Sequence, residues 1–132
     1  MRPAAEAFSQ LRLHGGYRTG IGKVPEAIGK LLVQKVIDAG ITHARISDPW
    51  NDFDTLREEH DTMRAMGMES VINLIYSISP RHTDEYFIGR VRKAAAMRPY
   101  RLCFKDVGGL LTPDRLAVLL PQVQEAAGDI PI

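Results

Sequence analysis

Lys105 is the residue of this sequence whose type and position suggest chemistry most directly. It follows the apolar run 102–104, and such a run is typical of a buried strand in a parallel sheet. A lysine there could form a Schiff base, act as a general base with a lowered pKa, or bind a metal ion after carbamylation. An ion pair with Asp106 or a neighbouring carboxylate is the structural alternative, which the residues alone favour.

Four other polar or aromatic residues lie at or just after the carboxyl ends of predicted strands. They are His14, Asp48, Asn51 and Tyr76. Ligands of parallel α/β proteins collect at this edge of the sheet, so we expect these side chains to share one rim with Lys105 and to contact a substrate. Asp48 and Asn51 could equally form the turn before a helix, and an N-cap is the stronger interpretation for the neighbouring Asp52.

These residues supply only part of a metal site. The sequence contains no His-x-His pair, and its 4 histidines and single cysteine, Cys103, lack the paired spacing of a structural zinc site. No G-x-G-x-x-G segment follows a predicted strand, which argues against dinucleotide binding. From the residues alone, the metal hypothesis is incomplete.

The elements that must position these residues are four short strands, each followed by a helix. The two kinds of run alternate with a period of about 30 residues, as expected for parallel strands joined by crossover helices. Glycines and polar turns separate them, and no hairpin signal interrupts the order. The predicted strands are 10–14, 42–47, 70–76 and 101–105, and the predicted helices begin near Pro25 and Phe53 and after the N-caps Thr83 and Thr112.

This pattern fits an open doubly wound sheet or part of a (β/α)8 barrel, and periodicity alone does not choose between them. A chain of 132 residues with 45% hydrophobic content fits one domain or part of one. A formal charge of +1 gives no indication of binding to nucleic acid or to an anionic membrane. No run resembles a membrane span or a signal peptide, and a single cysteine forms no internal disulfide, so a reducing cytoplasm is expected.

Three segments of the sequence, taken together, resemble one family. Residues 45–52 read Arg-Ile-Ser-Asp-Pro-Trp-Asn-Asp, residues 76–83 read Tyr-Ser-Ile-Ser-Pro-Arg-His-Thr, and residues 102–113 read Leu-Cys-Phe-Lys-Asp-Val-Gly-Gly-Leu-Leu-Thr-Pro. They are similar, in the same order, to Arg-Ile-Phe-Asp-x-x-Asn-Asp, Tyr-Thr-x-Ser-Pro-x-His-Thr and Ile-Cys-Ile-Lys-Asp-Met-Ala-Gly-Leu-Leu-Thr-Pro. These are motifs of the carboxyltransferase domain of biotin-dependent enzymes, found in pyruvate carboxylase, the α subunit of oxaloacetate decarboxylase and the central subunit of transcarboxylase.

The resemblance implies a (β/α)8 barrel, of which residues 1–132 form a single partial domain from the central part, about four βα units. In the family, a carbamylated lysine, an aspartate and a His-x-His pair bind a divalent metal, and Lys105 matches that lysine. The aspartate and the His-x-His pair are expected in the segments before and after this one. Zinc, manganese or cobalt is the implied metal, and biotin is carried by a separate domain or subunit.

The similarity is weaker near the N-terminus. The family's arginine for the ketoacid carboxylate aligns with His14, so bidentate recognition is lost unless Arg12 or Arg18 replaces it. The tyrosine expected to approach biotin aligns with Ile21, although Tyr17 is close in sequence. These departures concern the choice of substrate more than the fold.

The leading hypothesis is that the parent protein moves a carboxyl group between carboxybiotin and a small ketoacid, pyruvate or oxaloacetate, with Lys105 as catalytic and metal-binding residue. Its expected partners are the ketoacid, the biotin carrier domain, the remaining barrel segments and, in the parent, further copies in a homo-oligomer. Neither nucleic acid nor direct membrane insertion is expected. The alternatives are a metal-dependent lyase or aldolase-like synthase without biotin, favoured by His14 and Ile21, and a non-catalytic scaffold or truncated product without activity.

Overall fold

Four parallel strands form the main sheet of the computed structural model, which describes residues 10–12, 18–19, 22–23 and 25–132. The strands are β1 (Gln10–Arg12), β4 (His43–Ser47), β5 (Glu69–Tyr76) and β6 (Arg101–Asp106). They are neighbours in their chain order, β1-β4-β5-β6, and every pairing is parallel. A doubly wound sheet reverses its strand order at a switch point, whereas a barrel does not, so this order favours the barrel segment.

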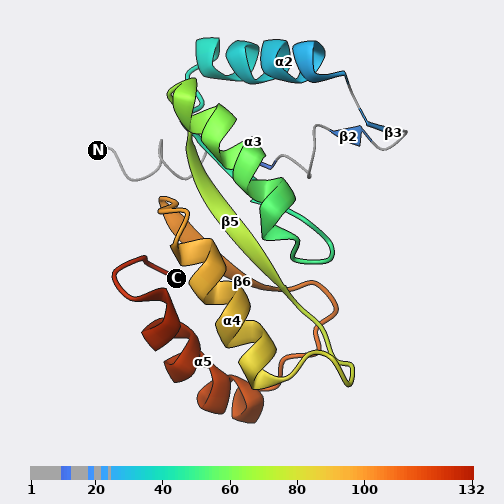
Figure 1. Cartoon of the computed structure of the whole chain (residues 1–132), viewed down its shortest axis with the longest axis vertical. Coiled ribbons are helices and arrows are strands. Elements are labelled where there is room, and N and C mark those ends of the chain that lie inside the picture. Colours follow the sequence, from blue (N-terminus) through green and yellow to red (C-terminus); the bar gives the residue numbers. More distant parts are fainter. Residues whose placement is uncertain (1–9, 13–17, 20–21, 24) are drawn as a thin grey trace.

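Within the described residues, four helices connect or follow these strands. They are α2 (Glu26–Asp38), α3 (Phe53–Ala65), α4 (Asp84–Ala95) and α5 (Pro113–Ala127). Figure 1 shows α3 and α4 lying over β5 and β6, with α5 beside α4 and α2 across the opposite end of the molecule. The predicted alternation of strands and helices is therefore confirmed.

The helix boundaries follow from local capping chemistry. The Thr83 side chain accepts a hydrogen bond from the backbone N–H of Tyr86 at 3.2 Å, and the Thr112 side chain accepts one from Arg115 at 3.3 Å. Both threonines thus satisfy a backbone donor that the first turn of a helix leaves free. Gly67 follows α3 with a φ of 88°, a conformation that side chains with a Cβ rarely adopt.

A small antiparallel ribbon lies between β1 and α2. It consists of β2 (Arg18–Thr19) and β3 (Gly22–Lys23), with Arg18 opposite Lys23. The prediction that no antiparallel pairing interrupts the order is therefore wrong for this connection. Strands of two residues are too short to show an alternating pattern, so in sequence the glycine-rich segment is indistinguishable from a loop. The ribbon is separate from the main sheet, whose predicted parallel pairing holds.

One apolar core lies between the sheet and the helices. At its centre Phe87 of α4 is fully buried, with its ring centroid 5.2 Å from that of Tyr76 and 5.6 Å from that of Phe104. Burying a ring of this size contributes about 1.5–3 kcal/mol to folding. The strand residues in this core are Ala44, Ile46, Ile72, Leu74, Tyr76 and Leu102, with Phe104 packed against them.

The intervening strand residues face the other way, because successive side chains of a strand point to opposite sides of the sheet. They include Arg45, Ser47, Val71, Asn73, Ile75, Cys103 and Lys105. A contact of 3.7 Å between Arg45 Nη2 and Cys103 Sγ joins two of them across the sheet. In a closed barrel this face lines the interior, and we call it the inner face.

α2 is the helix that the core covers least. Its Val33 is fully buried, but Ile28, Leu31 and Leu32 are about half exposed, with Leu31 at 58%. The apolar spacing predicted from the sequence is present, yet the described part of the chain supplies no cover for this side of the helix. No helix within the described ranges is long and apolar enough to cross a membrane.

Candidate active site at the carboxyl ends of the strands

Lys105 lies near the carboxyl end of β6, on the inner face. It is half-buried and stands in register with Ile75 of β5. Cys103 precedes it on the same face by two residues, in register with Asn73. The prediction that Lys105 lies at the sheet edge where ligands of barrel enzymes bind agrees with this placement.

Two residues before Lys105 along β6, the inner face carries a row of polar side chains that crosses three strands. Ser47, Asn73 and Cys103 are in register on adjacent strands, and Ser47 and Asn73 are buried. The Asn73 amide nitrogen donates a hydrogen bond to the carbonyl of Ile46 at 3.2 Å. Among the described residues the other amide atom, Oδ1, is buried without a partner. A buried polar row of this kind differs from the branched apolar layers that usually fill barrel interiors.

Asp48 organises the turn between β4 and α3. Its Oδ1 accepts hydrogen bonds from the backbone N–H of Trp50 at 2.7 Å and of Asp52 at 3.0 Å. Asp52 in turn is the N-cap of α3 and accepts from Asp54 at 3.1 Å, as predicted. Asp48 thus shapes the loop through one of its oxygens, and its contact with a substrate remains a prediction.

Asn51 fastens the same loop to β5. It is buried, its φ is 53°, and its side chain pairs with both backbone groups of Ile75. Nδ2 donates to the Ile75 carbonyl at 2.9 Å, and the Ile75 N–H donates to Oδ1 at 2.8 Å. Since β4 ends at Ser47, the Asn51 amide takes the place of the strand backbone that would otherwise pair with Ile75. This geometry supports a positioning role for Asn51 more than the predicted substrate contact.

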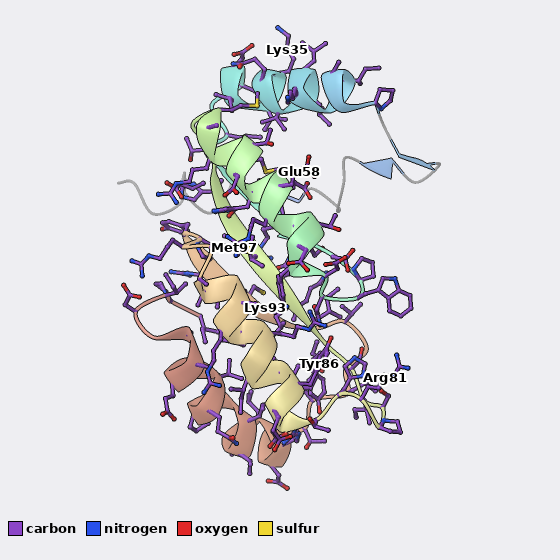
Figure 2. The ribbon with its side chains drawn as sticks, in the orientation of Figure 1. Lys35, Glu58, Arg81, Tyr86, Lys93 and Met97 are labelled. Carbon is purple, nitrogen blue, oxygen red and sulfur yellow. The ribbon has the colours of Figure 1, made fainter. Side chains whose placement is uncertain are left out.

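Asn51 also reaches α4 at this end of the molecule. Its Nδ2 lies 3.4 Å from the hydroxyl of Tyr86, whose ring is 5.0 Å from that of His82 between centroids. Figure 2 shows Tyr86 close to Arg81 at the carboxyl end of β5, and Met97 at the far end of α4. The loops after β4 and β5 are therefore joined by side chains at the rim.

Tyr76 ends β5 but faces the helices. Its ring is buried against Phe87, on the side of the sheet opposite to Lys105. Two hydrogen bonds raise the pKa of Arg115 above its usual value. The larger effect comes from its ion-pair partner, the Asp84 carboxylate, and the second largest from the Tyr76 hydroxyl. The structure therefore does not bring the Tyr76 and Lys105 side chains together, and the geometry lends no support to the predicted contact of Tyr76 with a substrate.

Asp106 holds the loop between β6 and α5, a role that was not predicted from the sequence. One carboxylate oxygen accepts the N–H of Leu110 at 3.0 Å, and the other accepts that of Leu111 at 2.8 Å. These bonds lower the pKa of Asp106, Leu111 contributing most, with smaller contributions from Gly108 and Gly109. An aspartate two residues before a Gly-Gly pair is a turn signal that could have revealed this role.

The described residues do not assemble a metal site on their own. Nowhere in them do three His, Cys, Asp or Glu side chains lie close enough together to hold an ion. The carboxylates beside the rim, Asp48 and Asp106, accept hydrogen bonds from loop backbone. His14, the fourth predicted substrate contact, lies outside the described residues. The predicted metal ligand within the described ranges is Lys105.

After α5 the chain returns to the sheet beside β6. The N–H of Leu102 donates to the carbonyl of Pro131 at 2.8 Å, and Ile130 is buried. A backbone hydrogen bond of this kind, between a strand and the segment that follows a crossover helix, is how the next parallel strand of a barrel begins. The edge of β6 next to Cys103 and Lys105 is therefore in line to receive another strand.

Comparison with known proteins shows which proteins this chain resembles. No family model matches the chain. It is 31% identical over 116 residues to a pyruvate carboxylase subunit of Methanocaldococcus jannaschii, covering 88% of this chain and 20% of that protein. It is 29% identical over 96 residues to the 2-oxoglutarate carboxylase large subunit of Hydrogenobacter thermophilus, covering 73% of this chain and 15% of that protein. Its homologues are pyruvate carboxylase and 2-oxoglutarate carboxylase subunits.

Solved carboxyltransferase structures agree with these sequence relatives. The carboxyl transferase domain of Rhizobium etli pyruvate carboxylase superposes with a TM-score of 0.80 at 22% identity, covering 89% of this chain and 21% of that one. The predicted resemblance to carboxyltransferase domains is confirmed, and the fold is that of part of such a barrel. The chain spans about a fifth or less of the length of the relatives it matches, 20% for the subunit from M. jannaschii.

Proposed function

We propose that this chain forms central strands of a carboxyltransferase barrel, which moves a carboxyl group between carboxybiotin and a small ketoacid. The observation that carries the proposal is the position of Lys105, near the carboxyl end of β6 and on the inner face of the sheet. Barrel enzymes place their reactive groups at this end of the strands. The homology to carboxylase subunits supports the same reaction class.

In this proposal Lys105 is carbamylated and supplies one oxygen ligand to a divalent metal such as zinc, manganese or cobalt. When bound, the metal would polarise the ketoacid carbonyl and so favour loss of a proton from the adjacent carbon. The described residues fit such a metal only in part, because they supply no cluster of His, Cys, Asp or Glu ligands. The other ligands would come from the remaining barrel segments, one of which would pair with the open edge of β6.

The chain's own residues would shape the entrance to the site. Asp48 and Asn51 hold the β4–α3 loop at the rim, which fixes the wall beside the inner face. The ketoacid carboxylate requires a hydrogen-bond donor or cation, and His14, Arg12 or Arg18 would supply it. Because the relatives are named for pyruvate and for 2-oxoglutarate, the proposal names a small ketoacid and not one compound.

The remaining partners follow from the same proposal. Biotin would arrive on a carrier domain, the other barrel segments would close the interior, and the complete protein would form a homo-oligomer in the cytoplasm. A lyase or aldolase-like synthase without biotin is the second candidate, and the residues that favour it, His14 and Ile21, lie outside the described part of the chain.

The reaction test uses the full protein encoded by the gene. Cleavage of oxaloacetate and carboxylation of pyruvate and 2-oxoglutarate are followed with and without avidin, which sequesters biotin. We expect at least one of these activities, and we expect avidin to abolish it. Cleavage that continues in avidin would favour the lyase alternative, and the absence of all three activities would contradict the proposal.

A metal titration tests how much of the site this chain contains. An open catalytic site normally needs about three protein ligands, and a lysine carbamate persists mainly when a metal holds it. For the 132-residue chain in bicarbonate, we expect zinc, manganese and cobalt to bind weakly by calorimetry. Submicromolar binding that disappears in Lys105→Ala would show that this segment builds a metal site alone.

A further inference from the structure

The loop after β6 wraps around a carboxylate of its own strand. Asp106 is the last residue of β6 and is in register with Tyr76, and its two oxygens accept the N–H groups of Leu110 and Leu111. Gly109 adopts a φ of 64°, which turns the loop so that consecutive backbone N–H groups point towards one centre. Such a concave set of N–H groups is an anion-binding arrangement, and here the anion is built into the chain.

The same loop connects Lys105 to the start of α5. Lys105 precedes Asp106 directly, and Leu111 is followed by Thr112, the N-cap of α5. Asp106 thus joins the end of the lysine-bearing strand to the first turn of the helix through two hydrogen bonds to a charged acceptor, which are stronger than neutral ones. Without these two bonds, the connection between strand and helix, residues 107–112, would lose this anchor.

Gly108 lies close to a side chain of its own loop. A Cβ on Gly108 would lie 3.2 Å from Cγ of Leu110, tighter than ordinary contact, so the backbone there runs close to a side chain of the same loop. Leu110 itself is exposed, whereas Leu111 packs against the core. The Asp106 bonds therefore fix an exposed and a core-contacting residue of the loop that follows Lys105.

We infer that Asp106 is the positioning residue of Lys105: its carboxylate fills the N–H cradle of the 108–111 loop and so fixes the end of β6 from which Lys105 projects. The importance of Asp106 for the reaction rests on the proposed function of Lys105. In this inference Asp106 acts through the loop, because each of its oxygens accepts a backbone hydrogen bond of that loop and it belongs to no cluster of three His, Cys, Asp or Glu side chains among the described residues.

The test replaces the carboxylate and then returns it from solution. In Asp106→Ala, amide hydrogen exchange at Leu110 and Leu111 should accelerate by at least about tenfold, since both protons lose a charged acceptor. Formate has the size and charge of the lost group, so added formate should restore slow exchange at these two amides. Labelling of Lys105 by an amine-acylating reagent, measured relative to exposed Lys93, should rise severalfold in the variant and fall again with formate.

Two further variants separate this role from general destabilisation. Asp106→Asn retains one oxygen and should leave one of the two amides protected, which also provides a readout if Asp106→Ala does not fold. Asp114→Ala removes an exposed carboxylate from the first turn of α5 and should change neither readout. Unchanged exchange in both Asp106 variants would overturn the inference, and so would faster exchange with unaltered Lys105 labelling. Neither readout needs ketoacid, biotin or metal, so a failure of the proposed function would appear separately, as missing turnover.

Discussion

The two faces of the main sheet differ in chemistry although they come from the same strands. The helix-facing side carries apolar residues such as Ile72 and Leu74, which belong to the same apolar core as Phe87. The inner face carries Ser47, Asn73 and Lys105 at alternate positions. A strand covered by helices on one side gains stability there, and its other side is free to carry polar groups. Because successive side chains of a strand point to opposite faces, the residues that stabilise the fold and the residues available for chemistry lie on opposite sides of the sheet.

Truncating the centre of the helix-facing side should have the largest effect. Phe87→Ala removes a fully buried ring that contacts Tyr76 and Phe104, and we expect a loss of about 3–5 kcal/mol in the free energy of unfolding. Urea denaturation followed by circular dichroism measures it. The control is Val118→Ala, an exposed position on α5, where we expect less than about 0.5 kcal/mol. Similar losses in both variants would show that Phe87 does not anchor the core.

Removing the buried clamp between the loop and β5 should have the next largest effect. Asn51→Ala leaves both backbone groups of Ile75 without their side-chain partners and keeps an unfavourable positive φ, so we expect a loss of about 2–4 kcal/mol. Asn51→Gly loses the same hydrogen bonds but relieves the backbone, so it should be about 1 kcal/mol more stable than the alanine variant. Rapid exchange of the Ile75 amide proton in both variants would confirm the clamp. A native exchange rate at Ile75 would refute it.

The fold is predictable from the sequence because its signals are local. Thr83 and Thr112 mark helix starts through one hydrogen bond each, and Gly40, Gly67 and Gly128, which follow observed helices, all adopt positive φ. The predicted end of β6 lies within one residue of its observed end at Asp106. Each of these signals depends on a few neighbouring residues, which the sequence contains.

The site is predictable in position and less so in detail. Alternation alone places Lys105 and Cys103 on one face, but whether Tyr76 joins them depends on its position relative to β6, which the register of Tyr76 with Asp106 decides. The clamp between Asn51 and Ile75 spans 24 residues, so no local pattern encodes it. Contacts between distant residues depend on how the strands align, and this is set by the packing of the whole sheet.

Lowering the pH should have the third largest effect, a gradual loss of folding stability on the helix-facing side. His60 is buried, and its Nδ1 shares a hydrogen bond of 2.6 Å with the Ser70 hydroxyl. Burial lowers the pKa of His60 below its ordinary value of 6.5, with smaller opposing effects from the charge of Asp61. The unfolded chain therefore binds this proton more readily than the folded one, so stability should fall as the pH drops below about 6.5 towards the lower folded pKa.

The variant that isolates this effect is His60→Gln, which cannot titrate. It should be less stable than the native chain at pH 8 but should lose less stability between pH 8 and pH 5. Urea denaturation at a series of pH values compares the two slopes. Equal slopes would assign the acid sensitivity to other groups, among them the carboxylate of Asp84, whose pKa is lowered chiefly by its hydrogen bond to Arg115.

The smallest effect on stability, and the largest on function, is expected at Lys105. The decisive measurement compares carboxyl transfer and thermal unfolding in the full protein for Lys105→Ala, Lys105→Arg and the exposed control Lys93→Ala, which Figure 2 places on α4. We predict that both Lys105 variants lose all turnover while their stability changes by less than about 1 kcal/mol, and that Lys93→Ala retains both. Substantial turnover in Lys105→Ala would contradict the account, because the reaction would then not depend on the Lys105 side chain.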